Sequence, residues 1–540
     1  MKPKPILPSV LKTTMPFLSQ LQYAPRANQA LADRTYLRWA RELGWRFPLF
    51  VILGFLAAPA LVILRSGMEL EGWEMAALIV IAPAALLVLI LGAYQAWCGI
   101  GELRHKLVWW HGLWVLIFVS SLVFRIRDAA DAQSLPIDGY ATLRILPEGI
   151  VALFLLVHFL NKGSSLRRSA LQGMVGVLSI YGLVCLISTF WSVQPTWTLY
   201  KSAEFLLDAS VLAAVLATVG STETYETFFN WTLILCGVEL LWTWFGAVLW
   251  PEEALHSMYP ERLVGVFPIQ SANAIGASGA ILAVVAISRL LPLPGCKFKR
   301  SWNILLFVFG VASMLACKTR AALAGFVVGA FLVLLFSRRA RIAALATSAC
   351  GLVVYIACLA LNAAPEPQAV WNSIASPGGA IVSFLQRSQS QDQVESLTGR
   401  MEWWHLGLQQ LMQHPWTGLG AYAGGKFAVL SKAGLGDTPQ LHSDYLETLV
   451  GTSVWGFIPL LIGLFGTWWL LFRFVRDRSL RPFERQLAFE AMGVLGVITV
   501  RSFVNVELIW HAPQFFLVVL GYAELLRRRA KWGVLQTTSE

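Results

Sequence analysis

Long apolar runs, separated by short polar or charged stretches, dominate this sequence. A helix needs roughly 20 apolar residues to cross the hydrocarbon core of a bilayer, and about fourteen segments meet that length. The pattern therefore predicts an all-α integral membrane protein, whose weakest spans are the fourth, the sixth and the last two. The segments lie near residues 48–65, 75–97, 107–124, 146–160, 170–190, 200–219, 229–250, 268–288, 302–317, 321–336, 342–361, 446–472, 488–506 and 509–525.

The composition agrees with this pattern. Of the 540 residues, 56% are hydrophobic and only 14% are charged, whereas soluble domains have about 25% charged residues. The mean hydropathy is +0.62. The seven cysteines are scattered without a CxxC pair, which favours small buried residues over disulfides or metal ligands.

Lysine and arginine residues cluster in every second polar segment, as the positive-inside rule requires of cytoplasmic loops. Both termini are therefore expected in the cytoplasm, although the cytoplasmic loop at 221–228 is acidic. The net charge of +11 follows from this topology and does not indicate a nucleic-acid partner. The basic N-terminal tail would contact anionic membrane lipids. The clusters lie near 34–46, 104–106, 162–168, 297–300, 338–341, 473–485 and 527–531.

The same alternation divides the chain into regions. The N-terminal segment lacks the features of a cleavable signal peptide, so its first helix is expected to remain as an anchor. The regions are a basic cytoplasmic tail (1–47), an extra N-terminal transmembrane region (48–145), a membrane core (146–361), one large loop outside the cytoplasm (362–445), C-terminal transmembrane helices (446–525) and a cytoplasmic tail (526–540).

The large loop combines irregular and helical sequence. Its first part, 362–379, is rich in Pro, Ala, Ser and Gly, which is typical of a loop. Apolar positions between residues 381 and 413 follow a helical period that breaks near Thr398. Pro415 would end this helix, and the following sequence GLGAYAGG (418–425) predicts a glycine-rich turn.

Several arginines occur on the side that the positive-inside rule depletes of them. Arg320 follows Lys318 in a short turn between two apolar runs, Arg262 precedes another helix, and Arg400 lies in the large loop. Such residues can be interfacial anchors, and Arg262 can pair with Glu261. A guanidinium group binds phosphate oxygens in pairs and keeps its charge. The set therefore favours a substrate with a diphosphate leaving group.

His442 precedes the helix that follows the large loop. Its imidazole would serve as a general base or an orienting group for a sugar hydroxyl, since the ordinary pKa of histidine lies near 6.5. Asp444 is expected to cap that helix, with Ser443 as a second candidate. The other two loop histidines, His405 and His414, are expected to be packing or capping residues.

No cofactor or metal site is indicated. His442 and Glu447 are five residues apart, which does not place them on one helical face, so a zinc pair is excluded. The sequence contains no P-loop, GxGxxG, HExxH or GxSxG element. Without a nucleotide-binding domain, the energy for any reaction must come from an ion gradient or from the substrate itself.

Five elements resemble, in the same order, the O-antigen ligase and polymerase superfamily of membrane glycosyltransferases. The resemblance covers residues 170–510, so the first helices lie outside it. After HSDYLE the chain reads TLVGTSVWG, where the superfamily usually has an acidic residue before the glycine. The elements are WSVQPTWTLYKS (191–202), RLVGVF (262–267), the Lys-Thr-Arg turn (318–320), TGR…HPWTGLG (398–420) and HSDYLE…G (442–451).

The resemblance implies a metal-independent, inverting glycosyltransferase with a GT-C-like fold in the bacterial inner membrane, with its active site on the periplasmic side. Its donor would be a glycan on undecaprenyl diphosphate, and the lipid diphosphate would be the leaving group. Arg262 and Arg320 would hold this diphosphate, and His442 would act at the acceptor hydroxyl. The remaining substrate-binding candidates are Arg400, Lys318 and Asp444.

Three functions fit these observations. A polymerase would join one lipid-linked glycan to another and so build O-antigen or exopolysaccharide, whereas a ligase would transfer glycan to lipid A-core or to protein. The long loop and the added helices favour the polymerase. A transporter or flippase would place charges at mid-membrane depth and have pseudo-symmetric halves. Here the ionisable residues concentrate at helix ends and in one loop.

Overall fold

The computed structural model describes residues 108–123, 127–255, 262–266, 269–336, 400–435, 440–509 and 514–537. The spans expected at 48–65, 75–97 and 342–361, and the first part of the large loop, lie outside these ranges. The described elements are α5 (Trp109–Leu122), α6 (Ala129–Ser134), α7 (Gly139–Leu171), α8 (Gly173–Ile187), η1 (Ser188–Trp191), α9 (Pro195–Thr218), α10 (Thr222–Leu249), α11 (Pro251–Leu255), β1 (Gly265–Val266), β2 (Ile269–Gln270), α12 (Ala272–Leu290), α13 (Arg300–Ala316), α14 (Arg320–Phe336), α18 (Arg400–Gln413), η2 (Gly424–Leu430), α19 (Asp444–Arg476), α20 (Pro482–Val504) and α21 (Gln514–Thr537).

The described part of the chain is a multi-pass, all-α membrane protein, as expected. Its only strands are the antiparallel pair β1–β2, and α5, α13 and α14 are shorter apolar helices. The total of about fourteen spans and the position of the loop outside the cytoplasm stay predictions. Six segments are long and apolar enough to cross a membrane: Gly139–Asn161, Gly173–Trp191, Thr222–Leu249, Ala272–Leu290, Asp444–Arg476 and Pro482–Val504.

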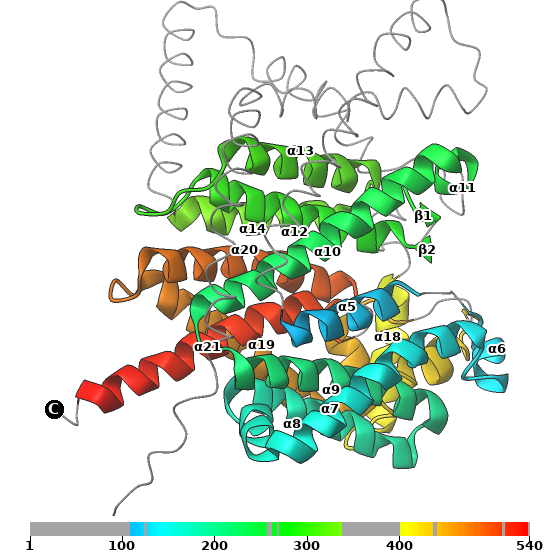
Figure 1. Cartoon of the computed structure of the whole chain (residues 1–540). Helices are drawn as coiled ribbons and strands as arrows, with labels where there is room; N and C mark the ends of the chain where they lie inside the picture. Colours follow the sequence, from blue (N-terminus) through cyan, green and yellow to red (C-terminus); the bar gives the residue numbers. More distant parts are fainter. Residues whose placement is uncertain are drawn as a thin grey trace, which may run out of the picture.

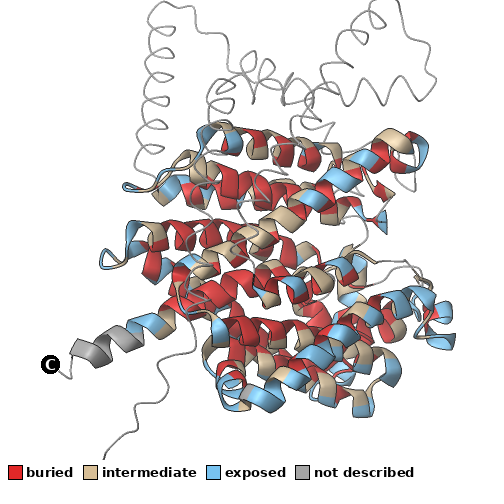
Figure 2. Ribbon diagram, in the orientation of Figure 1, coloured by how far each residue is buried: buried red, intermediate tan, exposed pale blue. Residues whose placement is uncertain are grey.

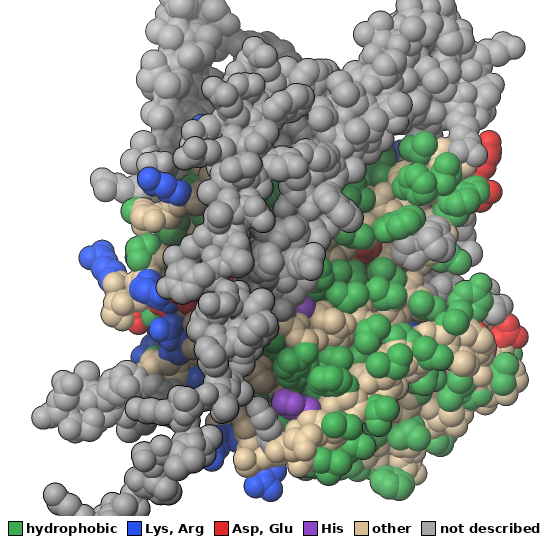
Figure 3. All heavy atoms as spheres, viewed as in Figure 1, with side chains coloured by type: hydrophobic (Ala, Val, Ile, Leu, Met, Phe, Trp, Pro, Cys, Tyr) green, Lys and Arg blue, Asp and Glu red, His purple; other side chains and the backbone are tan. Residues whose placement is uncertain are grey.

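The helices run roughly along one direction and share two ends (Figure 1). One end, here called the basic end, is held by ion pairs such as Arg289 with Glu490 at 2.7 Å and Arg528 with Glu524 at 2.9 Å. Figure 3 shows Lys and Arg side chains gathered at this end and Asp and Glu at the opposite one. This asymmetry is what the positive-inside rule predicts for a membrane protein.

The opposite end, here called the site end, contains the candidate residues of the sequence analysis. It is formed by the last turns of α10, α13 and α20 and by the first turns of α12, α14, α18 and α19. Backbone contacts join these segments, for example Leu263 N–H to Ala316 O at 3.0 Å and Val193 N–H to Leu419 O at 3.0 Å. Residues far apart in the sequence therefore meet at this end.

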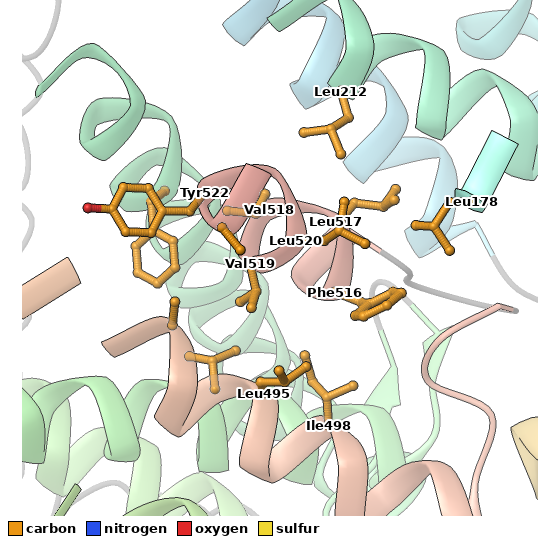
Figure 4. Packing of buried hydrophobic residues seen from close by; sticks show 14 of the residues in the cluster. Leu178, Leu212, Leu495, Ile498, Phe516, Leu517, Val518, Val519, Leu520 and Tyr522 are labelled. Carbon is orange, nitrogen blue, oxygen red and sulfur yellow. The ribbon is translucent and has the colours of Figure 1, made fainter. Parts of the chain in front are cut away.

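α21 occupies the middle of the bundle. Phe516 and Leu520 are fully buried, and Figure 4 shows α21 between Leu178 and Leu212 on one side and Leu495 on the other. Figure 2 shows the same distribution over the described residues, with buried residues inside and exposed ones on the periphery. In a bilayer such contacts stabilise the fold through close packing rather than through removal of apolar surface from water.

Glycine lets neighbouring helices approach closely. A β-carbon on Gly279 of α12 would lie 2.6 Å from the carbonyl oxygen of Gly310 in α13, so a larger residue would push the two helices apart. A β-carbon on Gly325 of α14 would lie 3.4 Å from Cγ of Arg501 in α20. This packing places Arg501 against α14 near the site end.

The helix predicted at 446–472 is present as α19, but it is kinked. Ser453 has φ 55° and ψ −151°, which interrupts the helix within its first ten residues. The carbonyl oxygens of Val450 and Gly451 instead accept hydrogen bonds from Leu419 and Gly420, both at 2.9 Å. The glycine-rich turn predicted at 418–425 is thus paired with the first part of α19. Position 420 requires glycine, because the backbone there has a φ of 98°, which other residues rarely adopt.

Candidate active site

The backbone on both sides of His442 is fixed by hydrogen bonds. Trp404 Nε1 of α18 donates to the carbonyl oxygen of Leu441 at 2.9 Å. The Leu441 N–H in turn donates to Glu447 Oε2, in the first turn of α19, at 3.0 Å. His442 itself has φ 53°, a left-handed conformation that a non-glycine residue adopts only when its surroundings hold it there.

The His442 imidazole lies between α18 and the end of α20. The Trp403 ring is tilted by 32° against it, with 5.7 Å between the centroids. The side-chain amide of Asn505 lies 3.4 Å from Nδ1. Burial and the positive charge of Arg400 lower the pKa of His442 to about 3. The ring is therefore neutral at neutral pH, and Arg400 lies close enough to His442 for its charge to act on the ring.

Asp444 does not cap α19, so that expectation is wrong. Ser443 occupies the N-cap position and makes no side-chain cap hydrogen bond. The Asp444 carboxylate is fully buried and reaches across to the segment after α20, where Oδ2 accepts the N–H groups of Glu507 at 2.8 Å and Leu508 at 3.0 Å. Asp444 therefore ties residues 505–509, here called the strap, to the start of α19.

Arg501 is the main residue that the sequence analysis missed. It is 1% exposed and forms an ion pair with Glu507, in which Nε lies 3.1 Å from Oε1. Its Nη2 also donates to the carbonyl oxygen of Asn273, in the first turn of α12, at 2.9 Å. A buried guanidinium is stable only when it is paired and hydrogen-bonded. Arg501 thus connects the strap to α12.

Arg262 and the Lys-Thr-Arg turn lie on the other side of Arg501. Arg262 Nε donates to the carbonyl oxygen of Cys317 at 3.1 Å. Lys318 follows with φ 48°, and Arg320 is the first residue of α14. The positive charges of Arg262 and Arg501 both act on the Cys317 thiol. Both guanidinium groups therefore lie near the same turn.

Among the predicted residues, these contacts connect Arg400 with His442 and bring Arg262 to the turn that precedes Arg320. The Asn505 amide lies between His442 and Arg501. Arg501 in turn lies near the 317–320 turn, to which Arg262 is hydrogen-bonded. The strap therefore connects the His442 region with the region around Arg262. The only signal for it in the sequence was Arg501 and Glu507 themselves, two charges in an otherwise apolar region. The packing role expected for His405 and His414 is wrong, because His405 on α18 and His414 just after it are both exposed.

Two more of the quoted motifs meet beside this site. Trp191 Nε1 donates to the carbonyl oxygen of Thr417 at 2.9 Å, and Thr198 Oγ1 donates to that of Ala421 at 2.8 Å. The 191–202 segment therefore supports the glycine-rich turn that pairs with α19. Within the described ranges, no group of three or more His, Cys, Asp or Glu residues is placed to hold a metal ion.

Residues 305–461 match the family described as O-antigen ligase. The matched segment runs from α13 to the middle of α19 and includes Lys318, Arg320, Arg400, His442 and Asp444. No curated protein matches the chain. The match supports, for this segment, the resemblance to the O-antigen ligase and polymerase superfamily that the sequence motifs indicated.

Proposed function

We propose that the protein is a polysaccharide polymerase that acts at the site end, on the periplasmic face of the bacterial inner membrane. It transfers a glycan from undecaprenyl diphosphate to a hydroxyl group of a second glycan. The family match supports glycan transfer in general. The choice of donor and acceptor rests on the residues of the site.

The observation that carries this proposal is the concentration of guanidinium groups at the site end. Figure 3 shows Lys and Arg side chains gathered at the basic end, as the positive-inside rule predicts for the cytoplasmic side. Arg262, Arg400 and Arg501 instead lie around His442 and the 317–320 turn. Cations on the face that usually lacks them suit an anionic ligand, and guanidinium binds phosphate oxygens in pairs.

Each residue has a distinct task in this reaction. Arg262 and Arg320 bind the diphosphate and offset the negative charge that develops on it as the bond to the sugar breaks. Arg400 and Lys318 extend this positive surface toward the donor. The donor is already activated by its sugar–diphosphate bond, so the reaction needs no nucleotide and no metal ion. Attack from the face opposite the diphosphate inverts the anomeric carbon.

His442 acts at the reacting centre. The sequence suggested that it takes the proton of the acceptor hydroxyl. A base whose pKa is about 3 is a weak one, because general-base catalysis is most efficient when the pKa lies near the working pH. The negative charge of a bound diphosphate would offset that of Arg400 and raise the pKa of the ring.

Ligation is the second candidate, because the matched family is described as O-antigen ligase. Both reactions use the same donor and the same guanidinium groups. They differ only in whether the acceptor is another lipid-linked glycan or lipid A-core. The long loop and the added N-terminal helices favour polymerisation.

The test is turnover by the purified, full-length protein in lipid nanodiscs. Undecaprenyl-diphosphate glycan is supplied alone or together with lipid A-core, and the products are separated by size. A ladder of longer lipid-linked glycans from the donor alone supports polymerisation, and glycan on lipid A-core supports ligation. If neither product forms and no donor is consumed, while the protein stays folded, the proposed function is wrong.

A further inference from the structure

The orientation of the Asn505 amide is determined by its neighbours. One end of the amide lies 3.1 Å from Arg501 Nη2, and the other end lies 3.1 Å from the carbonyl oxygen of Val504. Arg501 can only donate hydrogen bonds and the Val504 carbonyl can only accept them. The amide oxygen must therefore face Arg501, and the amide NH₂ must face Val504.

The same orientation decides the tautomer of His442. The amide atom next to His442 Nδ1, 3.4 Å away, is the one that faces Val504, so it is the NH₂ group. An NH₂ group stabilises a nitrogen that accepts a hydrogen bond. Because the ring is neutral and its Nδ1 is an acceptor, its single proton resides on Nε2.

The surroundings of the ring favour an anion as the ligand of Nε2–H. Trp403 covers one face of the imidazole and the strap occupies its Nδ1 edge. The guanidinium of Arg400 lies close enough for its charge to act on the ring. A neutral N–H donor beside a fixed positive charge suits a phosphate oxygen better than a hydroxyl that has to lose its proton.

We propose that Arg501 and Asn505 hold His442 as its Nε2–H tautomer, and that His442 donates a hydrogen bond to the diphosphate of the donor instead of acting as the base. This inference rests on the proposed function. The acceptor oxygen forms a bond to the anomeric carbon as the bond from that carbon to the diphosphate oxygen breaks. The electron pair of the broken bond leaves with the diphosphate, and the hydroxyl proton passes to solvent water. Asn505 and Arg501 are positioning residues in this step.

Replacing Asn505 by aspartate separates the two roles of His442. A carboxylate accepts hydrogen bonds, so Asn505→Asp draws the ring proton to Nδ1 and leaves Nε2 with a free lone pair. If His442 is a hydrogen-bond donor, kcat falls by roughly 10- to 100-fold, the range expected for one hydrogen bond to a charged group. If His442 is the base, the same variant keeps or increases kcat, and its rate gains an acid limb near pH 6 to 7. That second outcome would overturn the inference.

Substitution of His442 itself gives an independent test. The side-chain amide of glutamine can place an N–H group near the position of Nε2 but cannot act as a base at neutral pH. His442→Gln is therefore expected to stay within about 10-fold of the wild-type kcat, while His442→Ala loses roughly 100-fold. Equal loss of activity in both variants contradicts the donor role.

Binding of the product separates failure of this inference from failure of the proposed function. Undecaprenyl diphosphate in nanodiscs is the probe, and its affinity is measured without turnover. His442→Ala should weaken binding and His442→Gln should largely restore it, whereas a base would leave binding unchanged in both. If the wild-type protein neither binds this lipid nor consumes a glycan carried on it, the proposed function itself is wrong.

Control variants guard against effects on folding. Asn303 is buried at the basic end, where its Nδ2 donates to the Lys299 carbonyl oxygen at 3.0 Å. Asn303→Asp introduces the same change far from the site and should leave kcat, KM and the pH profile unchanged. His405→Ala and His414→Ala should also be mild, because both side chains are exposed. A loss in these controls equal to that of Asn505→Asp would show that the Asn505 effect is not specific.

Discussion

Asp444 accepts a hydrogen bond from the backbone N–H of Glu507 at 2.8 Å, while the carboxylate of Glu507 pairs with Arg501. Asp444 and Glu507 thus form two consecutive links, from the start of α19 to the strap and from the strap to Arg501. The first fixes the backbone of the strap, and the second fixes the guanidinium that faces the Asn505 amide. The position of His442 therefore depends on carboxylates that do not touch its ring.

Asp444→Ala should destabilise the protein and reduce activity together. The change leaves the N–H groups of Glu507 and Leu508 without their acceptor, and each such loss costs roughly 1–3 kcal/mol. Asp444→Asn keeps an oxygen in place and should be milder. Thermal unfolding in nanodiscs measures the stability. Full stability of Asp444→Ala would contradict the role of the strap.

Arg262→Lys and Arg320→Lys should each lower turnover by roughly 10- to 100-fold, the effect expected for losing one charged hydrogen bond. Lysine keeps the charge but lacks the planar fork that binds two phosphate oxygens. For Arg262 it also removes the Nε donor to the Cys317 carbonyl oxygen. The matched control is Arg300→Lys, an exposed residue at the basic end. Wild-type turnover in both site variants would show that these arginines only define the topology.

The pH dependence of the free energy of unfolding should show that His442 is neutral in the folded protein. The pKa of its ring is about 3 in the folded protein, against about 6.5 in an unfolded chain. Below pH 6.5 the unfolded chain takes up a proton that the folded protein does not, so this residue lowers the stability progressively from pH 6.5 down to about 3. Above pH 6.5 it has no such effect. His442→Gln should remove that part of the acid sensitivity, as chemical denaturation at several pH values would measure.

Single cysteines in a cysteine-free background should locate the two ends of the bundle. Lys432 at the site end and Arg478 at the basic end are both exposed. An impermeant maleimide should label Lys432→Cys before the inner membrane is permeabilised and Arg478→Cys only afterwards. The reverse order would invert the proposed orientation.

Much of the fold was predictable because a membrane helix is encoded locally. α10, α12 and α20 coincide approximately with apolar runs, and the helix that ends at Gln413 also follows from its own sequence. The strap was not predictable, because the burial of Arg501 depends on a carbonyl of α12 that is more than 200 residues away in the chain. From the sequence around it, Arg501 indicated only that the segment 488–506 is a weak candidate for a membrane span.

The kink of α19 was hidden for the same reason. Ser453 lies in the run GTSVWG (451–456), whose glycine and serine residues permit a kink but do not show whether or where the helix breaks. The pairing partners of the interrupted helix, Leu419 and Gly420, come from a loop more than 25 residues earlier. Backbone hydrogen bonds between distant segments leave no periodic signal in either one.

The break at Ser453 also divides α19 mechanically. Val450 and Gly451, before the break, accept hydrogen bonds from the glycine-rich turn. Beyond the break, Gly463 packs against Leu178 of α8, and Trp468 Nε1 donates to Thr499 Oγ1 of α20. A movement of the loop would therefore carry the first two turns of α19, and His442 with them, about a pivot at Ser453. Hydrogen exchange should divide at this residue, with residues 418–420 and 444–452 opening as one cooperative unit.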